Sequence, residues 1–309
     1  MKILIPPSEG KTKLKSTGPI FSETNFRFER EVGQIVRLLE LIDNEDLKSI
    51  YGTSQEKSEL FHRQNEDIFK SRCAPAIERY TGVVYEHLKW ETLKDSAKDY
   101  MEKNVLIFSG LFGMTTPLTM IPNYKLKMNV LSLQYHWNHT LTKILDSEEV
   151  IFDLLPQVYR KAYTPNKKNV IQIEFIVENK GKKTSAGHYG KAVKGKFIRF
   201  LAQNNVYDVK GITDFEYDGY SWNGEFFVKD LWLINMNPQN PIEKKDSVLI
   251  IDDLIATGGT AEAASKLVEI SKGKVAGFIF VINLFDLDGC NKLKKKNYKI
   301  SSLIEFPGH

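Results

Sequence analysis

Residues 246–263 read DSVLIIDDLIATGGTAEA, and this stretch decides how the end of the chain folds. Four apolar residues at 248–251 predict a buried strand, so Asp252 and Asp253 stand at its carboxyl end, where α/β folds bind their ligands. The loop at 256–260 carries two glycines and leads into a predicted helix. Backbone N–H groups and the partial positive charge at a helix start suit a phosphate group. We therefore expect a phosphate-binding loop here rather than a turn that Asp253 merely caps.

The rest of the tail continues the same pattern. Residues 275–284 and 300–306 read as two further strands, so the order is strand, helix, strand, strand. A helix between two apolar strands predicts a parallel βαβ unit that is buried on both faces. The polar segment INMNPQNPIEKKD at 234–246 separates this tail from the preceding chain. We therefore predict two domains, 1–230 and 231–309.

The first 230 residues show the periodicities of both helices and strands. Apolar runs predict strands at 1–5, 105–108 and 170–177. Helical spacing predicts helices at 29–47 and 194–203, and a helical stretch at 69–93 that Thr81-Gly82 interrupts. The aromatic-rich segment YDGYSWNGEFFV at 217–228 has Asn223-Gly224 at its centre. This dipeptide between two such runs is a strong β-hairpin signal.

Composition excludes several classes of protein. The 309 residues are 42% hydrophobic and 27% charged, which is typical of globular proteins. The longest apolar run, 275–285, contains Asn283 and is far shorter than the roughly 20 residues that span a bilayer. Cys73 and Cys290 lie far apart, so we expect no disulfide and a reducing, cytoplasmic environment. The net charge of +4 is too small to indicate nucleic-acid binding by itself.

One segment before the tail is strongly basic. Residues 180–199 read KGKKTSAGHYGKAVKGKFIR and contain seven cations but no carboxylate. We expect a basic turn, a small loop between Gly187 and Gly190, and then a helix. This arrangement suits nucleic-acid phosphates without reading base edges, whereas the alternative for any lysine-rich run is a solvated loop. The predicted DNA-binding residues are Lys182, Lys183, Lys191, Lys194, Lys196 and Arg199.

Other candidate sites carry weaker signals. His136 and His139 could share a helical face, but zinc needs three or four protein ligands and no Cys/His partner pattern lies nearby, so no metal site is predicted. The sequence SEGK at 8–11 follows a strand but lacks the GxxxxGK[ST] spacing of a P-loop. We expect a glycine-bounded turn near a basic groove there. No catalytic residue is assigned.

Three segments of the tail carry a family resemblance: VLIIDDLIATGGTAEAASKLVE at 248–269, FVINLFDLDG at 280–289 and SLIEFPGH at 302–309. Together they resemble the C-terminal part of adenine phosphoribosyltransferase. The resemblance implies that two aspartates face the ribose of phosphoribosyl pyrophosphate (PRPP) and that the following loop wraps its 5′-phosphate, with Mg²⁺ carried in by the pyrophosphate. The residues implied to bind PRPP are Asp252, Asp253, Ala256, Thr257, Gly258, Gly259 and Thr260.

The resemblance to a phosphoribosyltransferase is limited to the tail. The purine-recognition segment, the pyrophosphate loop and the mobile catalytic loop of such enzymes have no counterpart in residues 1–229. We therefore expect a partial domain that is not active as an isolated chain.

The front of the chain resembles the YaaA family of peroxide stress proteins. The segments that carry this resemblance are LIPPSEGKT at 4–12, IERYTGVVYEHL at 77–88, FSGLFGMTTPLTMIPNYKLKMN at 108–129, HWNHTLTKIL at 136–145, KKTSAGHYGKAVKGKFIRFL at 182–201 and GITDFEYDGYSWNGEFFVK at 211–229. The resemblance implies a mixed α/β fold with a helix-hairpin-helix-like basic element. It also implies DNA binding and a cytoplasmic role in limiting free iron during hydrogen peroxide stress.

The residues and the two resemblances together predict one fold class and one function. The fold class is α/β: a mixed α+β domain over 1–230, followed by a partial Rossmann-like phosphoribosyltransferase βαβ unit over 231–309. The expected function is peroxide-stress protection through sequence-nonspecific DNA binding, with no cofactor in the first domain and no membrane partner. PRPP with Mg²⁺ is the expected second ligand if the tail is functional. The alternative is purine salvage, in which adenine and PRPP give AMP and pyrophosphate. The oligomeric state stays open.

Overall fold

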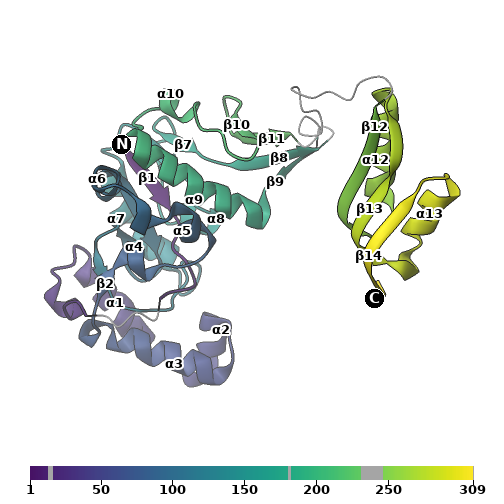
Figure 1. Cartoon of the computed structure of the whole chain (residues 1–309). Coiled ribbons are helices and arrows are strands. Elements are labelled where there is room, and N and C mark those ends of the chain that lie inside the picture. The colour runs from purple at the N-terminus through teal and green to yellow at the C-terminus, as the bar shows by residue number, and fades with distance from the viewer. Residues whose placement is uncertain (13–16, 180–181, 231–245, 309) are drawn as a thin grey trace. The chain divides into compact units, whose positions relative to one another are not determined.

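The computed structural model describes residues 1–12, 17–179, 182–230 and 246–308. The chain divides into two compact units, Met1–Trp232 and Leu233–His309 (Figure 1). Both units combine helices with sheets, so the predicted mixed α/β class is confirmed. The division itself lies among residues outside the described part of the chain, and each unit is considered by itself.

A five-stranded sheet forms the centre of the first unit. Its strands, in the order in which they pair, are β4 (Gly113–Thr115), β3 (Val105–Ser109), β1 (Lys2–Ile5), β6 (Ile151–Asp153) and β7 (Val170–Gln172). All neighbours are parallel except β3 and β4, which form an antiparallel hairpin. β3 is buried along its whole length, as expected of a parallel strand covered on both faces.

The order of the strands creates a switch point between β1 and β6. The next parallel strand after β1 is β3, on one side, whereas β7 follows β6 on the other side. The chain segments that leave β1 and β6 therefore diverge at the carboxyl edge of the sheet. Open α/β sheets bind ligands in the crevice that such a divergence leaves.

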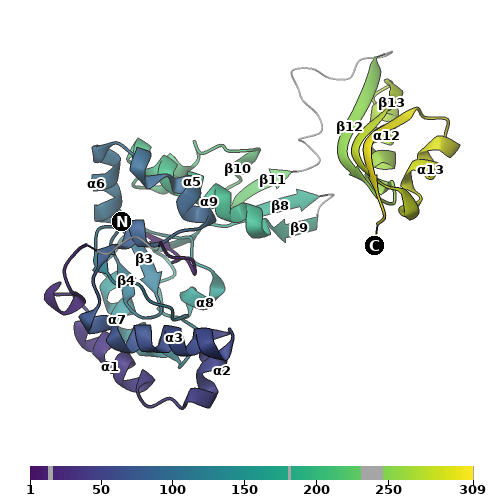
Figure 2. The same ribbon diagram turned by 60° about the horizontal axis from the view of Figure 1, so that its bottom comes forward.

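A second sheet lies beside the long helix α9 (Gly187–Asn204) (Figure 2). Its strands pair in the order β10 (Tyr220–Trp222), β11 (Phe227–Asp230), β8 (Phe175–Asn179) and β9 (Lys182–Ser185). Phe175, Phe197 and Phe227 pack between the sheet and the helix, with ring centroids 5.1–6.0 Å apart. The predicted hairpin at Asn223-Gly224 is confirmed by the β10–β11 pair.

Three local predictions were wrong. The helical stretch predicted at 69–93 contains only two short α-helices, α4 (Ala76–Arg79) and α5 (Val83–Leu88), and includes the strand β2 (Ala74–Pro75). The strand predicted at 170–177 is two strands, because β7 pairs with β6 in the central sheet and β8 pairs with β9 and β11 in the second sheet. The loop predicted between Gly187 and Gly190 is the first turn of α9. The basic segment is therefore a β-hairpin, β8–β9, that leads almost directly into a helix.

Short helices and one small sheet complete the first unit (Figures 1 and 2). The other helices are α1 (Glu29–Leu39), α2 (Leu47–Tyr51), α3 (Gln55–Glu66), α4 (Ala76–Arg79), α5 (Val83–Leu88), α6 (Asp95–Asn104), α7 (Leu133–Leu145), α8 (Gln157–Arg160) and α10 (Val209–Ile212). β2 (Ala74–Pro75) and β5 (Met120–Ile121) form an antiparallel pair.

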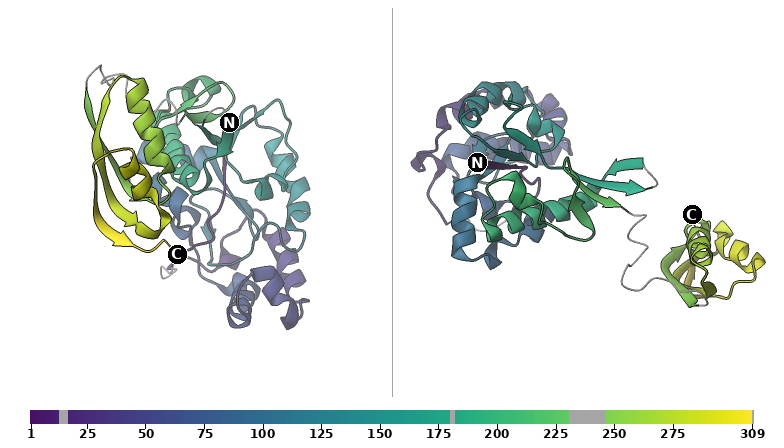
Figure 3. Two further views of the ribbon diagram at one scale, coloured as in Figure 1. Left: turned by 90° about the vertical axis from the view of Figure 1, so that its right-hand side faces the viewer. Right: turned by 90° about the horizontal axis from the view of Figure 1, so that it is seen from above.

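The second unit is a three-stranded parallel sheet with two helices (Figure 3). The strands β12 (Ser247–Ile255), β13 (Lys274–Leu284) and β14 (Ile300–Phe306) pair in sequence order, and α12 (Gly259–Ile270) connects the first two. The predicted parallel βαβ unit is thus confirmed. Both α12 and α13 (Gly289–Lys295) lie on one side of the strands (Figure 3).

The prediction that both faces of this sheet are buried was wrong. Phe278 and Phe280 are buried on the face that α12 covers. Ile251 and Leu303, at positions that alternate with the buried ones, expose 68% and 74% of their surface. The described residues therefore supply helices for one face only.

A close crossing of α5 and α9 holds the helical layer of the first unit together. Gly195 of α9 lies directly against the backbone of α5 near Val84 and Leu88. A Cβ atom on this residue would overlap the Val84 carbonyl oxygen and lie 2.8 Å from His87 Cβ. Only glycine fits this crossing without moving one of the helices.

Replacing Gly195 by alanine should therefore destabilise the first unit. The two helices must separate to admit the methyl group, which should lower the free energy of unfolding by about 2–3 kcal/mol. Urea unfolding followed by tryptophan fluorescence measures this change in the first unit, because all 4 tryptophans precede residue 233.

Gly33→Ala is the matched control. Gly33 also lies inside a helix, α1, but an added Cβ would have its nearest neighbours at 3.7 and 3.8 Å. Since alanine has a higher helix propensity than glycine by roughly 1 kcal/mol, this variant should be at least as stable as the parent. Unchanged unfolding of the Gly195→Ala variant would contradict the crossing.

Candidate functional site

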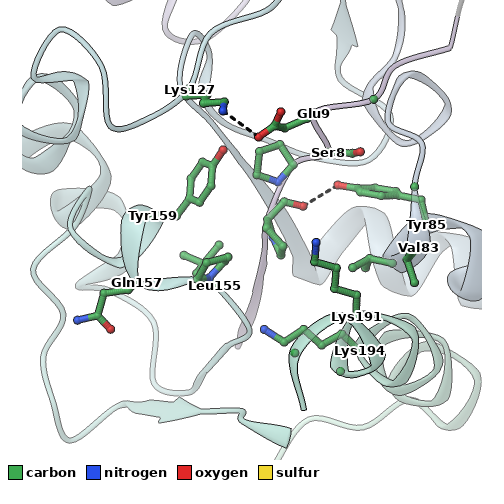
Figure 4. A pocket seen from close by; sticks show the side chains of 18 of the residues that line it. Ser8, Glu9, Val83, Tyr85, Lys127, Leu155, Gln157, Tyr159, Lys191 and Lys194 are labelled. Atoms are coloured by element: carbon green, nitrogen blue, oxygen red, sulfur yellow. Dashed lines mark hydrogen bonds and ion pairs between the residues drawn. The ribbon is translucent and has the colours of Figure 1, made fainter. Parts of the chain in front are cut away.

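A cavity of about 760 Å³ opens at the switch point of the central sheet (Figure 4). The segment 6–11, which follows β1, forms one part of its wall, and the segment 155–160, which follows β6, forms another. Gly187, Gly190 and neighbouring residues at the start of α9 line it as well. The cavity therefore lies where the topology alone favours ligand binding.

Much of the cavity wall is apolar or aromatic. Pro6, Val83, Leu155 and Phe175 contribute apolar surface, and three tyrosines come from separate elements: Tyr85, Tyr124 and Tyr159.

Two of these tyrosines are fixed by hydrogen bonds. The Tyr85 hydroxyl donates to the Pro6 carbonyl at 2.8 Å. The Tyr124 hydroxyl lies 2.8 Å from both the Tyr80 hydroxyl and Ser109 Oγ. Burial raises the pKa of Tyr85 and Tyr124 well above the usual value, so both stay neutral at physiological pH.

Six cationic side chains and two carboxylates face this cavity. The cations are Lys11, Lys125, Lys127, Arg160, Lys191 and Lys194, and the carboxylates are Glu9 and Glu174. Glu9 bridges Lys125 and Lys127 at 3.1 and 3.2 Å. Arg160 pairs with Asp153 and with Glu174, each at 2.9 Å.

Three cavity lysines have no carboxylate partner among the described residues: Lys11, Lys191 and Lys194. Lys11 Nζ donates to the Ser8 carbonyl at 3.2 Å and lies 4.2 Å from the centre of the Tyr124 ring, a cation–π distance. Lys194 Nζ donates to the Leu154 carbonyl at 2.7 Å. The cavity is therefore electropositive.

Burial changes the protonation of two of these lysines. Loss of hydration, together with the positive charge of Lys125, lowers the pKa of Lys11 to about 7, although Glu9 opposes the shift. Burial and the charge of Arg160 lower the pKa of Lys194 to about 8. An anion in the cavity would replace the lost hydration and favour the charged amines. The site can thus bind an anion and exchange a proton near neutral pH.

The predicted DNA-binding residues divide among several surfaces. Lys191 and Lys194 face the cavity from α9 (Figure 4). Lys182 and Lys183 lie on the exposed strand β9, where Lys183 Nζ is 4.7 Å from the centre of the Phe226 ring. Lys196 turns away from the cavity, with its Nζ 5.6 Å from the centre of the Tyr217 ring.

The Arg199 side chain has a structural role. Its guanidinium donates to the carbonyl oxygens of Leu88 and Lys89 at 2.9 and 3.0 Å, and to Thr92 Oγ1 at 2.9 Å. These carbonyls belong to the last residue of α5 and to the residue after it, where a helix otherwise leaves acceptors without donors. Arg199 therefore ties α9 to the end of α5 and does not lie with Lys191 and Lys194.

Sequence reasoning assigned no binding role to four of the six cations that line the cavity: Lys11, Lys125, Lys127 and Arg160. SEGK at 8–11 was expected to form a glycine-bounded turn near a basic groove, and it forms part of the cavity wall. Lys125 and Lys127 lie in an irregular segment without periodicity, so no local signal marks them. Only the pairing of distant strands brings them to one place.

The loop predicted to bind PRPP begins α12 in the second unit. Gly258 has φ +79°, and an added Cβ would lie 3.1 Å from the Gly289 carbonyl oxygen, so this position requires glycine. The Ala256 carbonyl accepts a hydrogen bond from the Gly289 N–H at 3.0 Å, and the Thr257 carbonyl accepts one from Lys292 Nζ at 3.2 Å. The loop is therefore held in shape by α13.

The remaining PRPP-binding candidates lie at the surface. Thr257, Gly259 and Thr260 are exposed, and open space surrounds the position of an added Cβ on Gly259. Asp253 is exposed and its N–H donates to Asp252 Oδ1 at 2.9 Å. The N-terminus of α12 is thus accessible to an anion. The two aspartates, expected at the carboxyl end of the strand, lie within β12, which continues to Ile255.

The described residues show neither a cluster of metal-binding side chains nor a helix that could span a membrane. They contain no cluster of three or more His, Cys, Asp or Glu side chains that could hold a metal ion. Among the same residues, no helix is both long enough and apolar enough to cross a membrane.

Comparison with known proteins separates the two parts of the chain. Over 71 residues it is 66% identical to an adenine phosphoribosyltransferase of Pelagibacter ubique, which covers 23% of this chain and 41% of that protein. A crystal structure of adenine phosphoribosyltransferase from Thermoanaerobacter pseudethanolicus matches 21% of this chain and 36% of that one, with 48% identity and a TM-score of 0.20. The chain thus spans less than half the length of these relatives.

Relatives of the larger part cover most of the chain. A Campylobacter jejuni protein without an assigned function is 31% identical over 221 residues, which are 67% of this chain and 86% of that protein. A UPF0246 protein of Fusobacterium nucleatum is 27% identical over 72% of this chain and 94% of its own length. The family model described as peroxide stress protein YaaA matches residues 1–226. The chain therefore belongs to the YaaA family of peroxide stress proteins.

Proposed function

We propose that this protein acts in peroxide stress by binding DNA without sequence preference and helping to limit free iron in the cytoplasm. Its family membership supports the stress role. The observation that carries DNA binding is the exposed Lys182 and Lys183 on β9, followed along the chain by Lys191 at the mouth of an electropositive cavity. Lysines on a strand and a helix start contact phosphates and carry no information about base sequence.

DNA binding would protect DNA from iron, whereas the limit on the free iron pool itself is proposed from family membership. Lysine ammonium groups that neutralise phosphates displace the cations condensed around DNA, and ferrous iron is one of the cations that such phosphates attract. A protein that covers DNA in this way lowers the amount of iron held where peroxide would react with it. This proposal requires no iron ion in the protein itself.

Replacing Lys182, Lys183 and Lys191 by alanine should weaken binding to duplex DNA and reduce its salt dependence. If all three contact phosphates, the slope of log K against log salt concentration should become less negative by about 2.7. Fluorescence anisotropy of a labelled duplex between 50 and 200 mM salt, roughly the range over which such contacts lose most affinity, measures both effects.

The matched control replaces Lys48, Lys57 and Lys143 by alanine. These lysines are also exposed and the change in net charge is the same, but they lie on α2, α3 and α7. This variant should bind DNA with nearly the parent's salt slope. Equal slopes for the two triple variants would mean that β9 and α9 do not form the DNA-binding surface.

In cells, loss of this protein should raise free iron during exposure to hydrogen peroxide. Electron paramagnetic resonance of chelated iron measures the pool directly. The parent gene should restore the lower level, and the variant with Lys182, Lys183 and Lys191 replaced should not. Restoration by that variant would separate iron limitation from DNA binding.

Purine salvage is the second candidate, favoured by the 66% identity of the tail to an adenine phosphoribosyltransferase. The N-terminus of α12 supports binding of the PRPP phosphate, and Mg²⁺ would arrive with the pyrophosphate. However, the chain spans only 41% of that relative, and its first 226 residues match another family. We therefore propose that the tail retains phosphate-binding groups without the salvage reaction.

The purified chain should form no AMP from adenine, PRPP and Mg²⁺. The groups that would bind adenine and the leaving pyrophosphate have no counterpart in the matched segment. A coupled pyrophosphate assay at high protein concentration tests this expectation. A steady rate that Asp253→Asn abolishes would instead establish the salvage activity.

A further inference from the structure

We propose that the cavity between β1, β6 and α9 binds one nucleoside monophosphate unit, either a free nucleotide or a single nucleotide unstacked from bound DNA. The second source rests on the DNA binding proposed above, whereas the first does not. The proposed site is the interior of the cavity and does not include the lysines outside it.

The cavity has the position and the size of a small-molecule site. The cavity opens beyond the carboxyl ends of β1 and β6, at the point where their following segments diverge. Its volume of about 760 Å³ lies within the range of roughly 300–1,000 Å³ that is typical of small-molecule sites. A nucleoside monophosphate is a ligand of this size class.

The distribution of charge selects a phosphate. Lys125 and Lys127 share the single negative charge of Glu9, and Arg160 pairs with two carboxylates. Lys11, Lys191 and Lys194 have no such partner among the described residues, and all three line the cavity. Cations without a salt-bridge partner in a partly dehydrated cavity attract an anion more strongly than the same cations in water.

The N-terminus of α9 adds to this charge. Lys191 and Lys194 lie in the first turns of the helix, and Gly187 and Gly190 line the cavity beside them. The first backbone N–H groups of a helix have no acceptor within the helix, and its dipole favours an anion at this end. The phosphate is therefore expected next to α9.

The opposite wall suits a planar, largely apolar group. Leu155, Gln157 and Tyr159 come from the segment after β6 and lie across the cavity from Lys191 and Lys194 (Figure 4). A nucleobase can stack on a tyrosine ring at a gain of about 1–3 kcal/mol, and the Gln157 amide can both donate to and accept from a base edge. A sugar phosphate without a base would leave this apolar wall uncovered.

The cavity mouth connects the site to the proposed DNA surface. Ser185 ends β9, Gly187 begins α9, and both residues line the cavity. Lys182 and Lys183 precede them on the exposed strand. A DNA backbone held by these lysines would bring its nucleotides to the mouth, where one could leave the stack at a cost of a few kcal/mol.

The lysines make binding depend on pH in a defined direction. The pKa of Lys11 is lowered to about 7 and that of Lys194 to about 8, whereas a phosphate monoester is already largely dianionic above its second pKa of about 6. Affinity should therefore fall as pH rises from 6.5 to about 9, since the amines lose their protons there. The charged groups around the two lysines are Glu9, Lys125 and Arg79 for Lys11, and Arg160, Asp153, Glu174 and Lys191 for Lys194.

Calorimetric titration of the full chain with dAMP, dGMP, dCMP and dTMP tests the site. We expect saturable binding of one nucleotide per chain that weakens with rising pH. Lys11→Met keeps a long side chain but removes the charge, and should lower affinity about tenfold or more. Lys57→Met removes an exposed lysine on α3 and should leave the affinity unchanged.

One further variant and two further ligands keep this test decisive. Lys194→Met should also weaken binding, and tryptophan fluorescence shows which variants remain folded. Inorganic phosphate and deoxyribose 5-phosphate should bind at least tenfold more weakly than the nucleotides, because they cannot use the tyrosine-lined wall. Equal binding of these ligands, or unchanged nucleotide affinity in folded Lys11→Met protein, would overturn the proposal.

A duplex that carries 2-aminopurine in a mismatched base pair distinguishes a free nucleotide from one unstacked from DNA. Fluorescence that rises on binding in the parent but not in Lys11→Met would show an unstacked nucleotide in the cavity. Free nucleotides that bind without such a rise would assign the site to free nucleotides, and no response from either probe would overturn the proposal. If the parent binds free nucleotides but does not bind the duplex, the result would count against the proposed DNA binding and leave the nucleotide site standing.

Discussion

The parallel pairing of β1 between β3 and β6 is the constraint on which the rest of the first unit depends. It places the ends of two strands that are about 150 residues apart in sequence side by side. Their following segments must then diverge, because β3 and β7 lie on opposite sides. The cavity, its tyrosines and its lysines all occupy the space that this divergence leaves.

Helix α9 completes that space because it crosses α5 closely at Gly195. Arg199 stabilises the same crossing by donating hydrogen bonds to the Leu88 and Lys89 carbonyl oxygens at the end of α5. These two residues do not touch the cavity, yet they position Lys191 and Lys194 at its edge. A cation in the basic segment thus has a structural role, while its neighbours provide the charge of the site.

The two units offer an anion different kinds of group. In the first unit, lysine side chains are partly dehydrated, and two of them have lowered pKa values, so their charge depends on pH near neutrality. In the second unit, Gly258 begins a helix whose backbone N–H groups carry no titratable proton at these pH values. Binding by the loop at 256–260 would therefore change little with pH, in contrast to binding in the cavity.

The local sequence pattern by itself determined several strands, a helix and a hairpin of this protein. The strand, glycine loop and helix from 247 to 270, the short strand β1 and the hairpin at Asn223-Gly224 follow from residues that are neighbours in sequence. Tertiary structure alone decided that 170–177 is shared between two sheets, that Arg199 caps α5, and that Lys11 meets Lys194 in one cavity. The physical reason is range: periodicity and turn chemistry act over a few residues, whereas the pairing of distant strands decides which loops share a site.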